Sequence, residues 1–398
     1  MSRPARVGVV GLGFIGTAHI ETLRRIGVEV AGVVGSEPGR TRDQAAALGA
    51  TPYESLEALL ADPGIGVVHL ATPNHLHHAQ ALAALEAGKH IVCEKPLALS
   101  AAETAELVAA ADARGLVNAV CFVYRFFPLN HQVRALVGSG DLGSPWLVQG
   151  SYHQDWLMRD NDWNWRIDPR RGGALRAVGD IGSHWLDLVE WIIGDRVTRV
   201  MADLSTFLPV RRRPDRRVGT FGAASEPGEA LIDERVDTED AAGVLLRFGG
   251  GARGTLSLAQ VVAGRKNLLA YELAGSRAAT AWSSEDAEEL WIGHRERANE
   301  LLLRDPSLLG DDAARLTTYP AGHAEGFADA FAGLFREVYT AIGSGGPPPD
   351  PAYPTFRDGH RAVLLGEAVA RSAQEERWID VTETATYQTP TSTGATTP

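Results

Sequence analysis

The sequence predicts two folded parts: an α/β half with a doubly wound parallel sheet, then an α+β half with a mostly antiparallel open sheet. Three observations lead to this prediction. A short apolar strand at the start of the chain runs into a glycine-rich turn that opens a helix. Strand and helix patterns then alternate up to about residue 127, which is typical of a parallel sheet. Beyond that point apolar strands follow one another through glycine-rich turns, as in antiparallel sheets.

Length and composition limit the classes of protein that fit. The chain has 398 residues, of which 44% are hydrophobic and 22% are charged, so it is long enough for two domains with sizeable cores. We expect domains at residues 1–127 and 128–381, and a disordered Thr-, Ser- and Pro-rich tail at residues 382–398. The net charge of −12 argues against nucleic acid or an anionic membrane as the main partner.

Cysteine content and hydropathy indicate where the protein works. Cys93 and Cys121 both lie in apolar strand-like runs, so we expect core residues rather than a disulfide or a metal pair, and we expect no metal. No apolar run approaches the length of a membrane span. The first residues enter a strand at once, which leaves no room for a signal peptide. We therefore expect a cytoplasmic location.

The first glycine-rich turn predicts a dinucleotide site. Residues 7–10 form a buried-strand run that leads into Gly11, Gly13 and Gly16, and a helix follows at residues 17–26. In this context Gly11 makes the tight turn, Gly13 lets the backbone approach the pyrophosphate, and Gly16 lets the helix pack on the strand. Phe14 and Ile15 complete the turn, and the helix N-terminus offers free N–H groups to the anion. This is the fingerprint of a Rossmann domain that binds NAD or NADP.

The end of the second strand, residues 28–34, bears on the choice of cofactor. NAD sites usually place an acid there for the ribose 2′-hydroxyl, but this chain has Gly35 and Ser36, and Glu37 comes slightly late. Arg40 could meet a 2′-phosphate. We therefore expect NADP to be accepted and NAD to remain possible. An ordinary solvated loop is the alternative for Ser36 and Arg40.

Two further loops should lie at the ligand-facing edge of the parallel sheet. Thr72 and Asn74 follow the strand at residues 67–71, and Glu94 and Lys95 follow the strand at residues 90–93. Ligands bind off the carboxyl ends of parallel strands, so the Lys95 ammonium could lie beside the nicotinamide. The remaining elements predicted in this half are helices at residues 45–48, 56–60, 76–87 and 104–113 and a strand at residues 118–122.

The stretch at residues 174–194 carries the second candidate group. Asp180 sits where a helix N-cap would sit, and apolar residues then recur at helical spacing. Asp180 and His184 are four residues apart and would share a face if the first turn includes Asp180. An acid beside a His can transfer protons, because the carboxylate raises the basicity of the imidazole. A capping Asp with a satisfied His is the alternative.

The second half is predicted as strands followed by helices. A helix is expected at residues 129–137, and strands at residues 147–152, 197–204, 241–248, 252–259, 268–274, 278–282 and 289–292. Residues 209–233 lack periodicity and are rich in Arg, Pro and Gly, so they predict a long loop or lid. Helices at residues 326–339 and 361–373 and a strand at residues 378–381 complete the chain.

Aromatic residues gather in one part of this half. Six of the nine tryptophans lie between Trp146 and Trp191. Flat aromatic faces suit the C–H surface of a sugar ring, although most of these residues could simply fill the core. Trp156, beside Gln154, is the best candidate for a pocket, and Arg125, Trp282 and His323 are weaker candidates.

Six short motifs in order resemble the Gfo/Idh/MocA family of oxidoreductases. They are G-L-G-F-I-G at residues 11–16, A-T-P-N-x-x-H at 71–77, E-K-P at 94–96, Y-R-F at 124–126, W-R at 165–166 and G-D-I-G-S-H at 179–184. The similarity runs from about residue 6 to about residue 381. Within the family the chain looks most like sugar and anhydrosugar 3-dehydrogenases of the levoglucosan type, through residues 152–156, 264–267 and 322–326.

The resemblance implies roles for particular residues. It implies that Lys95, Asp180 and His184 form the catalytic group and also meet the substrate, a sugar, anhydrosugar, glycoside or cyclitol. The glycines, Thr72, Asn74, His77, Glu94 and Lys95 would line NAD or NADP, with Trp165 and Arg166 near its nicotinamide end. It also implies a homodimer or homotetramer through the C-terminal sheet. His184 would be the general base, Asp180 would hold the imidazole or the substrate hydroxyl, and Lys95 would stabilise the alkoxide.

Two other classes of function stay open at this point. One is glycoside hydrolysis, in which bound NAD oxidises the sugar transiently, an aglycone is eliminated and the sugar is reduced again. The other is a dinucleotide sensor without catalysis. Lys95, Asp180 and His184 together argue against a sensor, because a sensor needs none of them.

Overall fold

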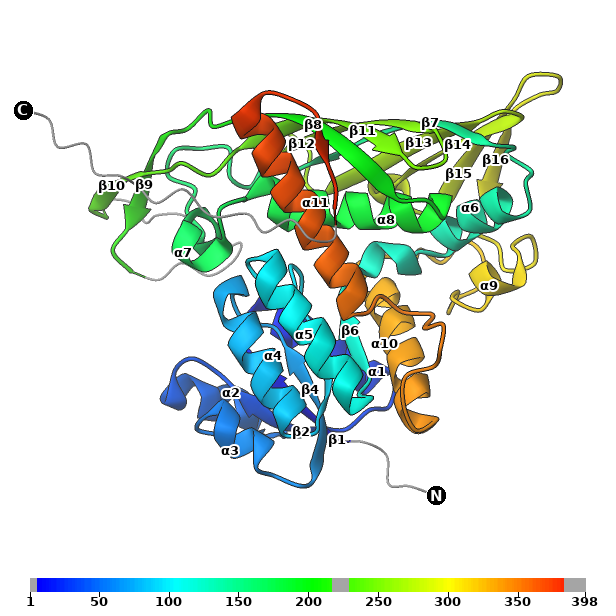
Figure 1. Ribbon diagram of the computed structural model, residues 1–398. Coiled ribbons are helices and arrows are strands. Elements are labelled where there is room, and N and C mark those ends of the chain that lie inside the picture. Colours follow the sequence, from blue (N-terminus) through cyan, green and yellow to red (C-terminus); the bar gives the residue numbers. More distant parts are fainter. Residues whose placement is uncertain (1–5, 217–228, 383–398) are drawn as a thin grey trace, which may run out of the picture.

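The computed structural model describes residues 6–216 and 229–382, and it confirms the predicted fold class. Figure 1 shows a parallel sheet flanked by helices and, above it, a larger sheet with helices on the side that faces the first half. In chain order, β6 is the last strand of the six-stranded sheet and β7 is the first strand of the nine-stranded sheet. The domain boundary at residue 127, which falls between these strands, stays a prediction.

The N-terminal sheet has the strand order β3-β2-β1-β4-β5-β6, and all its pairs are parallel. At its centre Val9 of β1 lies between Val33 of β2 and His69 of β4. The strands are β1 (Arg6–Val10), β2 (Val30–Val34), β3 (Thr51–Pro52), β4 (Ile65–Leu70), β5 (His90–Cys93) and β6 (Asn118–Val120). The helices between them are α1 (Phe14–Arg25), α2 (Pro38–Leu48), α3 (Leu56–Leu60), α4 (His77–Glu86) and α5 (Ala101–Arg114).

The larger sheet has the order β16-β15-β14-β13-β7-β12-β11-β8-β17, and its pairs are antiparallel except β7 with β12. Its strands are β7 (Pro145–His153), β8 (Val197–Ser205), β11 (Ala241–Phe248), β12 (Arg253–Ala259), β13 (Leu268–Gly275), β14 (Ala278–Ser283), β15 (Glu289–His294), β16 (Glu300–Leu303) and β17 (Ile379–Asp380). Alternate residues along β11 and β12 are buried, so one face meets the helices and the other stays open.

Helices tie the two halves together. α6 (Pro128–Gly138) and α8 (Ser183–Ile193) lie along the covered face of the large sheet, and α7 (Pro169–Gly172) and α9 (Asp311–Ala314) are short. α10 (Phe327–Gly343) returns to pack against α1, and α11 (Phe356–Glu375) crosses from β8 and α8 to α5 (Figure 1). The main apolar core therefore continues from β1 and α1 into the helices under the large sheet.

Some sequence expectations fail here. Within residues 209–233, which are predicted as a loop or lid, β9 (Val210–Pro214) and β10 (Leu231–Arg235) form an antiparallel pair. The sequence of this hairpin lacks apolar alternation, and a buried ion pair attaches it to the protein: the Arg211 guanidinium donates to Asp240 Oδ1 at 2.7 Å. Residues 217–228 lie outside the described residues, as does the predicted tail beyond residue 382. Among the described helices none could cross a membrane.

Candidate active site

The glycine-rich turn has the geometry that a dinucleotide requires. Gly11 has φ +97°, and a Cβ there would lie 2.5 Å from the Ala71 carbonyl oxygen. A Cβ at Gly16 would meet the Gly11 oxygen at 1.8 Å, so the turn and the start of α1 are packed too closely for a side chain. A Cβ at Gly13 would meet nothing within 4 Å, which leaves open space above the N-terminus of α1. These residues fit a bound pyrophosphate.

The other predicted cofactor residues lie around this edge. Phe14 is 51% exposed and Ile15 is half-buried; Ser36, just after β2, and Arg40, in the first turn of α2, are exposed. Thr72 lies in the loop after β4, and its hydroxyl donates to Gln80 at 2.6 Å. Their contacts with a cofactor stay predictions.

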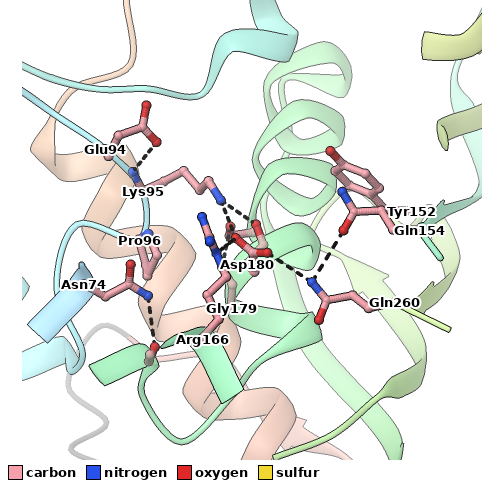
Figure 2. Close-up of polar contacts among 12 residues, drawn as sticks. Asn74, Glu94, Lys95, Pro96, Tyr152, Gln154, Arg166, Gly179, Asp180 and Gln260 are labelled. Atoms are coloured by element: carbon pink, nitrogen blue, oxygen red, sulfur yellow. Dashed lines mark hydrogen bonds and ion pairs between the residues drawn. The ribbon is translucent and has the colours of Figure 1, made fainter. Parts of the chain in front are cut away.

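Two predicted cofactor residues, His77 and Asn74, also fasten loops, and their contacts with a cofactor stay predictions. The fully buried His77 ring lies 2.8 Å from the Thr72 carbonyl oxygen and 2.8 Å from the Pro96 carbonyl oxygen. It therefore ties together the loops after β4 and β5. The Asn74 amide donates to the Gly172 carbonyl at 3.0 Å, which joins the nucleotide half to α7 (Figure 2).

Lys95 crosses from the nucleotide half to the second half. Its Nζ donates to Asp180 Oδ1 at 2.7 Å and to the Asp180 carbonyl oxygen at 2.9 Å (Figure 2). An ammonium has three donors, so among the described residues two are used by Asp180 and a third is left for a ligand. The Lys95 side chain is 12% exposed, which keeps its charge in a region of low dielectric.

Asp180 is the centre of the polar contacts in Figure 2. Arg166 Nε donates to Oδ1 at 3.1 Å, and Gln260 Nε2 donates to Oδ2 at 3.0 Å. Burial favours the neutral acid, but the charges of Arg166 and Lys95 outweigh it and hold the pKa of the carboxyl well below its usual range. Asp180 is therefore a permanent anion that orients Lys95.

The expectation that Asp180 caps a helix is wrong. A π-helical turn, Val178–Gly182, leads directly into α8, and Asp180 lies inside that turn. The turn begins where the buried Glu239 carboxylate accepts from the backbone N–H groups of Arg176 (2.9 Å) and Val178 (2.8 Å). Because Glu239 satisfies these donors, the Asp180 side chain is left for Lys95, Arg166 and Gln260. Single π-helical turns inside helices are often found at functional sites.

His184 lies in the first turn of α8 and is buried among aromatic rings. Its ring centroid is 5.2 Å from that of Tyr124 and 5.8 Å from that of Phe122. Burial, followed by the charge of Lys95, lowers the pKa of the imidazole to about 3, so the ring is neutral near pH 7. A neutral ring nitrogen can accept a hydrogen bond from a substrate hydroxyl, whereas the lowered pKa opposes full protonation of the ring. Its Nδ1 has no hydrogen-bond partner among the described residues. No hydrogen bond joins it to Asp180 in the described part of the chain, so the first of the two expected roles of Asp180, holding the imidazole, is not observed.

Several residues near the site are absent from the sequence predictions. The Tyr124 hydroxyl lies 2.7 Å from that of Tyr152 and accepts from Asn267 Nδ2 at 2.9 Å. Asn267 Oδ1 in turn accepts from Gln154 Nε2 at 2.8 Å. Together with Gln260 these side chains make a polar wall that continues from Asp180 to Tyr124. Tyr124, Tyr152 and Asn267 fall within motifs that carry the family resemblance, and the signal for Gln260 is its position as a polar residue directly after the apolar strand β12.

The predicted aromatic and arginine residues divide into two groups. Trp156 donates from its indole N–H to Gln154 at 2.7 Å, and the Arg166 guanidinium lies 4.4 Å from the Trp165 ring centroid and 5.8 Å from that of Trp156. These four residues lie around Asp180. The structure thus brings Gln154, Trp156, Trp165 and Arg166 together, as the sequence predicts, whereas their contacts with substrate or cofactor stay predictions.

Three weaker candidates lie elsewhere or have other partners. The Arg125 guanidinium pairs with Asp187 of α8 and Asp358 of α11, so it joins two helices, and its contact with a substrate stays a prediction. Trp282 is 3% exposed and packs against the Phe127 ring, as a core residue does. His323 is exposed, and its carbonyl oxygen accepts from Arg304 at 2.6 Å.

The arrangement can stabilise a negatively charged oxygen and accept a proton. Two cations, Lys95 and Arg166, contact one carboxylate, Asp180, and Glu94 adds a second buried carboxylate near the His184 ring. The Lys95 ammonium, with its third N–H, rather than the net charge of the site, favours an alkoxide over an alcohol. The glycine turn follows β1 and Lys95 follows β5, so both lie at the same edge of the parallel sheet. A dinucleotide bound at the glycine turn would therefore have its nicotinamide at this edge.

Comparison with known proteins agrees with this geometry. Residues 5–122 match the model of an oxidoreductase family with an NAD-binding Rossmann fold, and residues 130–280 match the GFO/IDH/MocA C-terminal domain. Levoglucosan dehydrogenase of Pseudarthrobacter phenanthrenivorans is 29% identical over 94% of this chain and 97% of its own.

Solved structures show the same likeness in three dimensions. A levoglucosan dehydrogenase in complex with NADH and L-sorbose has a TM-score of 0.84 at 28% identity, covering 95% of this chain and 99% of its own. An inositol dehydrogenase homolog from Azotobacter vinelandii in complex with NAD+ has a TM-score of 0.83 at 29% identity, covering 96% and 98%. The fold, the site and both matched domains thus show that this chain belongs to the Gfo/Idh/MocA family of NAD-binding oxidoreductases.

Proposed function

We propose that this protein is an NAD(P)-dependent dehydrogenase that oxidises a secondary alcohol of a sugar, anhydrosugar, glycoside or cyclitol. The observation that carries the proposal is the 2.7 Å contact between Lys95 of the nucleotide half and Asp180, which lies one helical turn before the buried His184. The relatives named for levoglucosan and inositol support this class of substrate.

The proposed roles follow from charge and burial. When bound, the nicotinamide supplies the hydride acceptor or donor. Lys95 donates its third N–H to the reacting oxygen and lowers the pKa of the hydroxyl by favouring the alkoxide. His184, neutral at pH 7, takes the hydroxyl proton in oxidation and returns it in reduction. Asp180 orients Lys95 and offsets its charge, and Gln154 and Trp156 lie where the rest of the sugar would contact the protein.

The test is a panel of sugars, anhydrosugars and cyclitols with NAD and with NADP, followed by absorbance of the reduced nicotinamide at 340 nm. We expect at least one ring alcohol to give reduced cofactor and ketone in equal amounts. Release of an aglycone without net absorbance change would replace this proposal with hydrolysis through transient oxidation. Cofactor binding without any turnover across the panel would favour a sensor.

We also propose that the protein forms a homodimer or homotetramer through the open face of the large sheet and works in the cytoplasm. That face is hollowed, and it carries Leu245 and Leu301, which are 46% and 57% exposed. Apolar side chains gathered on one face indicate a contact surface. Light scattering should give twice or four times the monomer mass for the native protein and the monomer mass for Leu245→Glu; a monomeric native protein would exclude the assembly.

A further inference from the structure

Four polar side chains lie in a row inside the N-terminal half, and none has a part in the reaction above. They are His19 of α1, His69 of β4, Glu94 after β5 and Tyr339 of α10. The two histidines are 0% exposed and Glu94 is 8% exposed. Phe335 packs against both histidines, with its ring centroid 5.0 Å from that of His19 and 4.8 Å from that of His69. Buried polar groups of this kind must find partners within the protein.

The four groups are joined end to end by hydrogen bonds. His19 Nε2 lies 3.1 Å from Glu94 Oε1, and His19 Nδ1 lies 3.0 Å from His69 Nδ1. His69 Nε2 lies 2.9 Å from the Tyr339 hydroxyl. We name this row the His19 chain.

The carboxylate at one end decides the direction of every bond. An ionised carboxylate only accepts, so His19 donates from Nε2, and a ring with a single proton then accepts at Nδ1. His69 must then donate from Nδ1 and accept at Nε2, and the Tyr339 hydroxyl must donate to it. Burial holds the pKa of His69 well below its usual range, and although burial alone would raise the pKa of Glu94, the bond from His19 leaves it lowered. With this direction every bond of the row has one donor and one acceptor.

The Glu94 end of the His19 chain reaches the catalytic loop. Glu94 Oε2 accepts from the backbone N–H of Lys95 at 3.3 Å, and the Lys95 side chain then reaches Asp180 (Figure 2). At the same time His19 lies on α1, the helix that begins at the glycine turn. The His19 chain therefore connects the helix expected to carry the pyrophosphate with the loop that carries Lys95.

We propose that His19 is a positioning residue: through Glu94 it fixes the loop of Lys95 relative to α1, and His69 and Tyr339 complete the hydrogen bonding of the row. The inference rests on the proposed function in one respect, the catalytic part given to Lys95. A misplacement of about 1 Å at a reacting group can cost about 100-fold in rate, so a residue without contact with the substrate can control turnover.

A metal ion is the competing explanation for the same atoms. Ligand atoms of His19, Glu94 and Cys121 lie within 4.8 Å of one another, and Cys121 Sγ is 3.8 Å from His19 Nε2. A metal would take the lone pair of His19 Nε2, which would move the proton to Nδ1 and reverse every bond of the chain. The two explanations therefore predict opposite tautomers for both histidines.

The first experiment measures these tautomers and does not depend on activity. Protein labelled with 15N-histidine is examined by long-range 1H–15N NMR at pH 7, and His19→Gln and His69→Gln variants assign the two rings. We expect a proton on Nε2 of His19 and on Nδ1 of His69, and no stoichiometric metal by mass spectrometry. The opposite tautomers, or one bound zinc or iron per chain, would overturn the proposal.

The second experiment separates positioning from stability. His19→Ala should lower kcat by about 10- to 100-fold while the KM for the sugar changes little. His19→Gln, whose amide can still donate to Glu94, should recover part of the loss. Phe331→Leu is the matched control, since its ring packs on His19 at 5.2 Å without joining the chain; it should lower the Tm and leave kcat near normal.

Two results of the second experiment would contradict positioning. One is a loss of kcat in His19→Ala that is equal to the loss in Phe331→Leu at the same Tm. The other is a His19→Gln variant no more active than His19→Ala. If the native protein oxidises no alcohol in the panel, the proposed function is wrong. The tautomers of the first experiment still show whether the hydrogen bonds of the His19 chain run in the assigned direction.

Discussion

Replacing Asp180 with Asn removes the charge at the centre of the site and keeps the shape. In the native protein Asp180 accepts from Lys95 at 2.7 Å and from Arg166 at 3.1 Å. The three side chains are only 12 to 16% exposed, so water screens their charges weakly. In Asp180→Asn two nearly buried cations would face each other across a neutral amide.

The size of the effect follows from this loss of pairing. Removing one partner of a buried ion pair costs about 3–5 kcal/mol, and we expect about 3 kcal/mol here because the cations keep some contact with water. This loss should lower the Tm by roughly 5–10 °C. Turnover should fall as well, since the Lys95 ammonium loses the charged partner that orients it toward the substrate oxygen.

The assay is thermal unfolding followed by tryptophan fluorescence, with kcat measured on the same samples. Glu234→Gln serves as the control, because Glu234 pairs with Arg213 on the exposed hairpin and should cost less than about 1 kcal/mol. Equal Tm values for Asp180→Asn and the native protein, or an unchanged kcat, would refute the reasoning.

The pH dependence gives a second check on the same variant. The folded-state pKa of Asp180 is lowered, so its charge contributes stability above the unfolded pKa of about 4 and loses that contribution as the pH falls below it. The difference between Asp180→Asn and the native protein should therefore be largest near pH 7 and shrink below pH 4. A difference that stays constant down to pH 3 would contradict the assignment.

Four other predictions concern single residues. His184→Ala should lower kcat by about 10²–10⁴-fold, with the affinity for NADH, measured by fluorescence titration, near normal. Lys95→Ala should lower kcat and weaken NADH binding in the same assays, and native turnover in this variant would exclude its role. Burial lowers the pKa of His131 to about 3, so the folded state resists its protonation and His131→Gln should recover about 2 kcal/mol of unfolding free energy at pH 5 but little at pH 7, as urea titrations can show. Arg40→Ala should raise the KM for NADP more than the KM for NAD; equal changes would show that Arg40 does not meet a 2′-phosphate.

Local patterns were enough to predict the scaffold because its signals are short in range. The glycines at residues 11, 13 and 16 follow a strand and open a helix, and both the turn and α1 form as expected. Apolar alternation likewise predicted β11 and β12, where alternate side chains are buried. In each case the residue pattern that predicts the element lies within a few positions of the sequence.

The site was only partly predictable because its partners come from distant parts of the chain. The Asp180 side chain was expected at a helix N-terminus, but Glu239 takes over the capping and frees Asp180 for Lys95 and Arg166. Arg125 was a candidate for substrate contact in the sequence, but the structure pairs its guanidinium with Asp187, 62 positions later in the chain. Tertiary packing decides which charged residues form pairs, and these pairs cannot be predicted from local patterns in a single sequence.

The most direct measurement is a crystal structure of the protein with NADH and the best sugar from the panel. We predict that Lys95 Nζ and one nitrogen of the His184 ring both lie within about 2.6–3.2 Å of the same substrate oxygen. The carbon that bears this oxygen should lie about 3–3.5 Å from C4 of the nicotinamide. A substrate oxygen that reaches only one of the two groups, or a ring that binds away from the nicotinamide, would contradict the proposed dehydrogenase site.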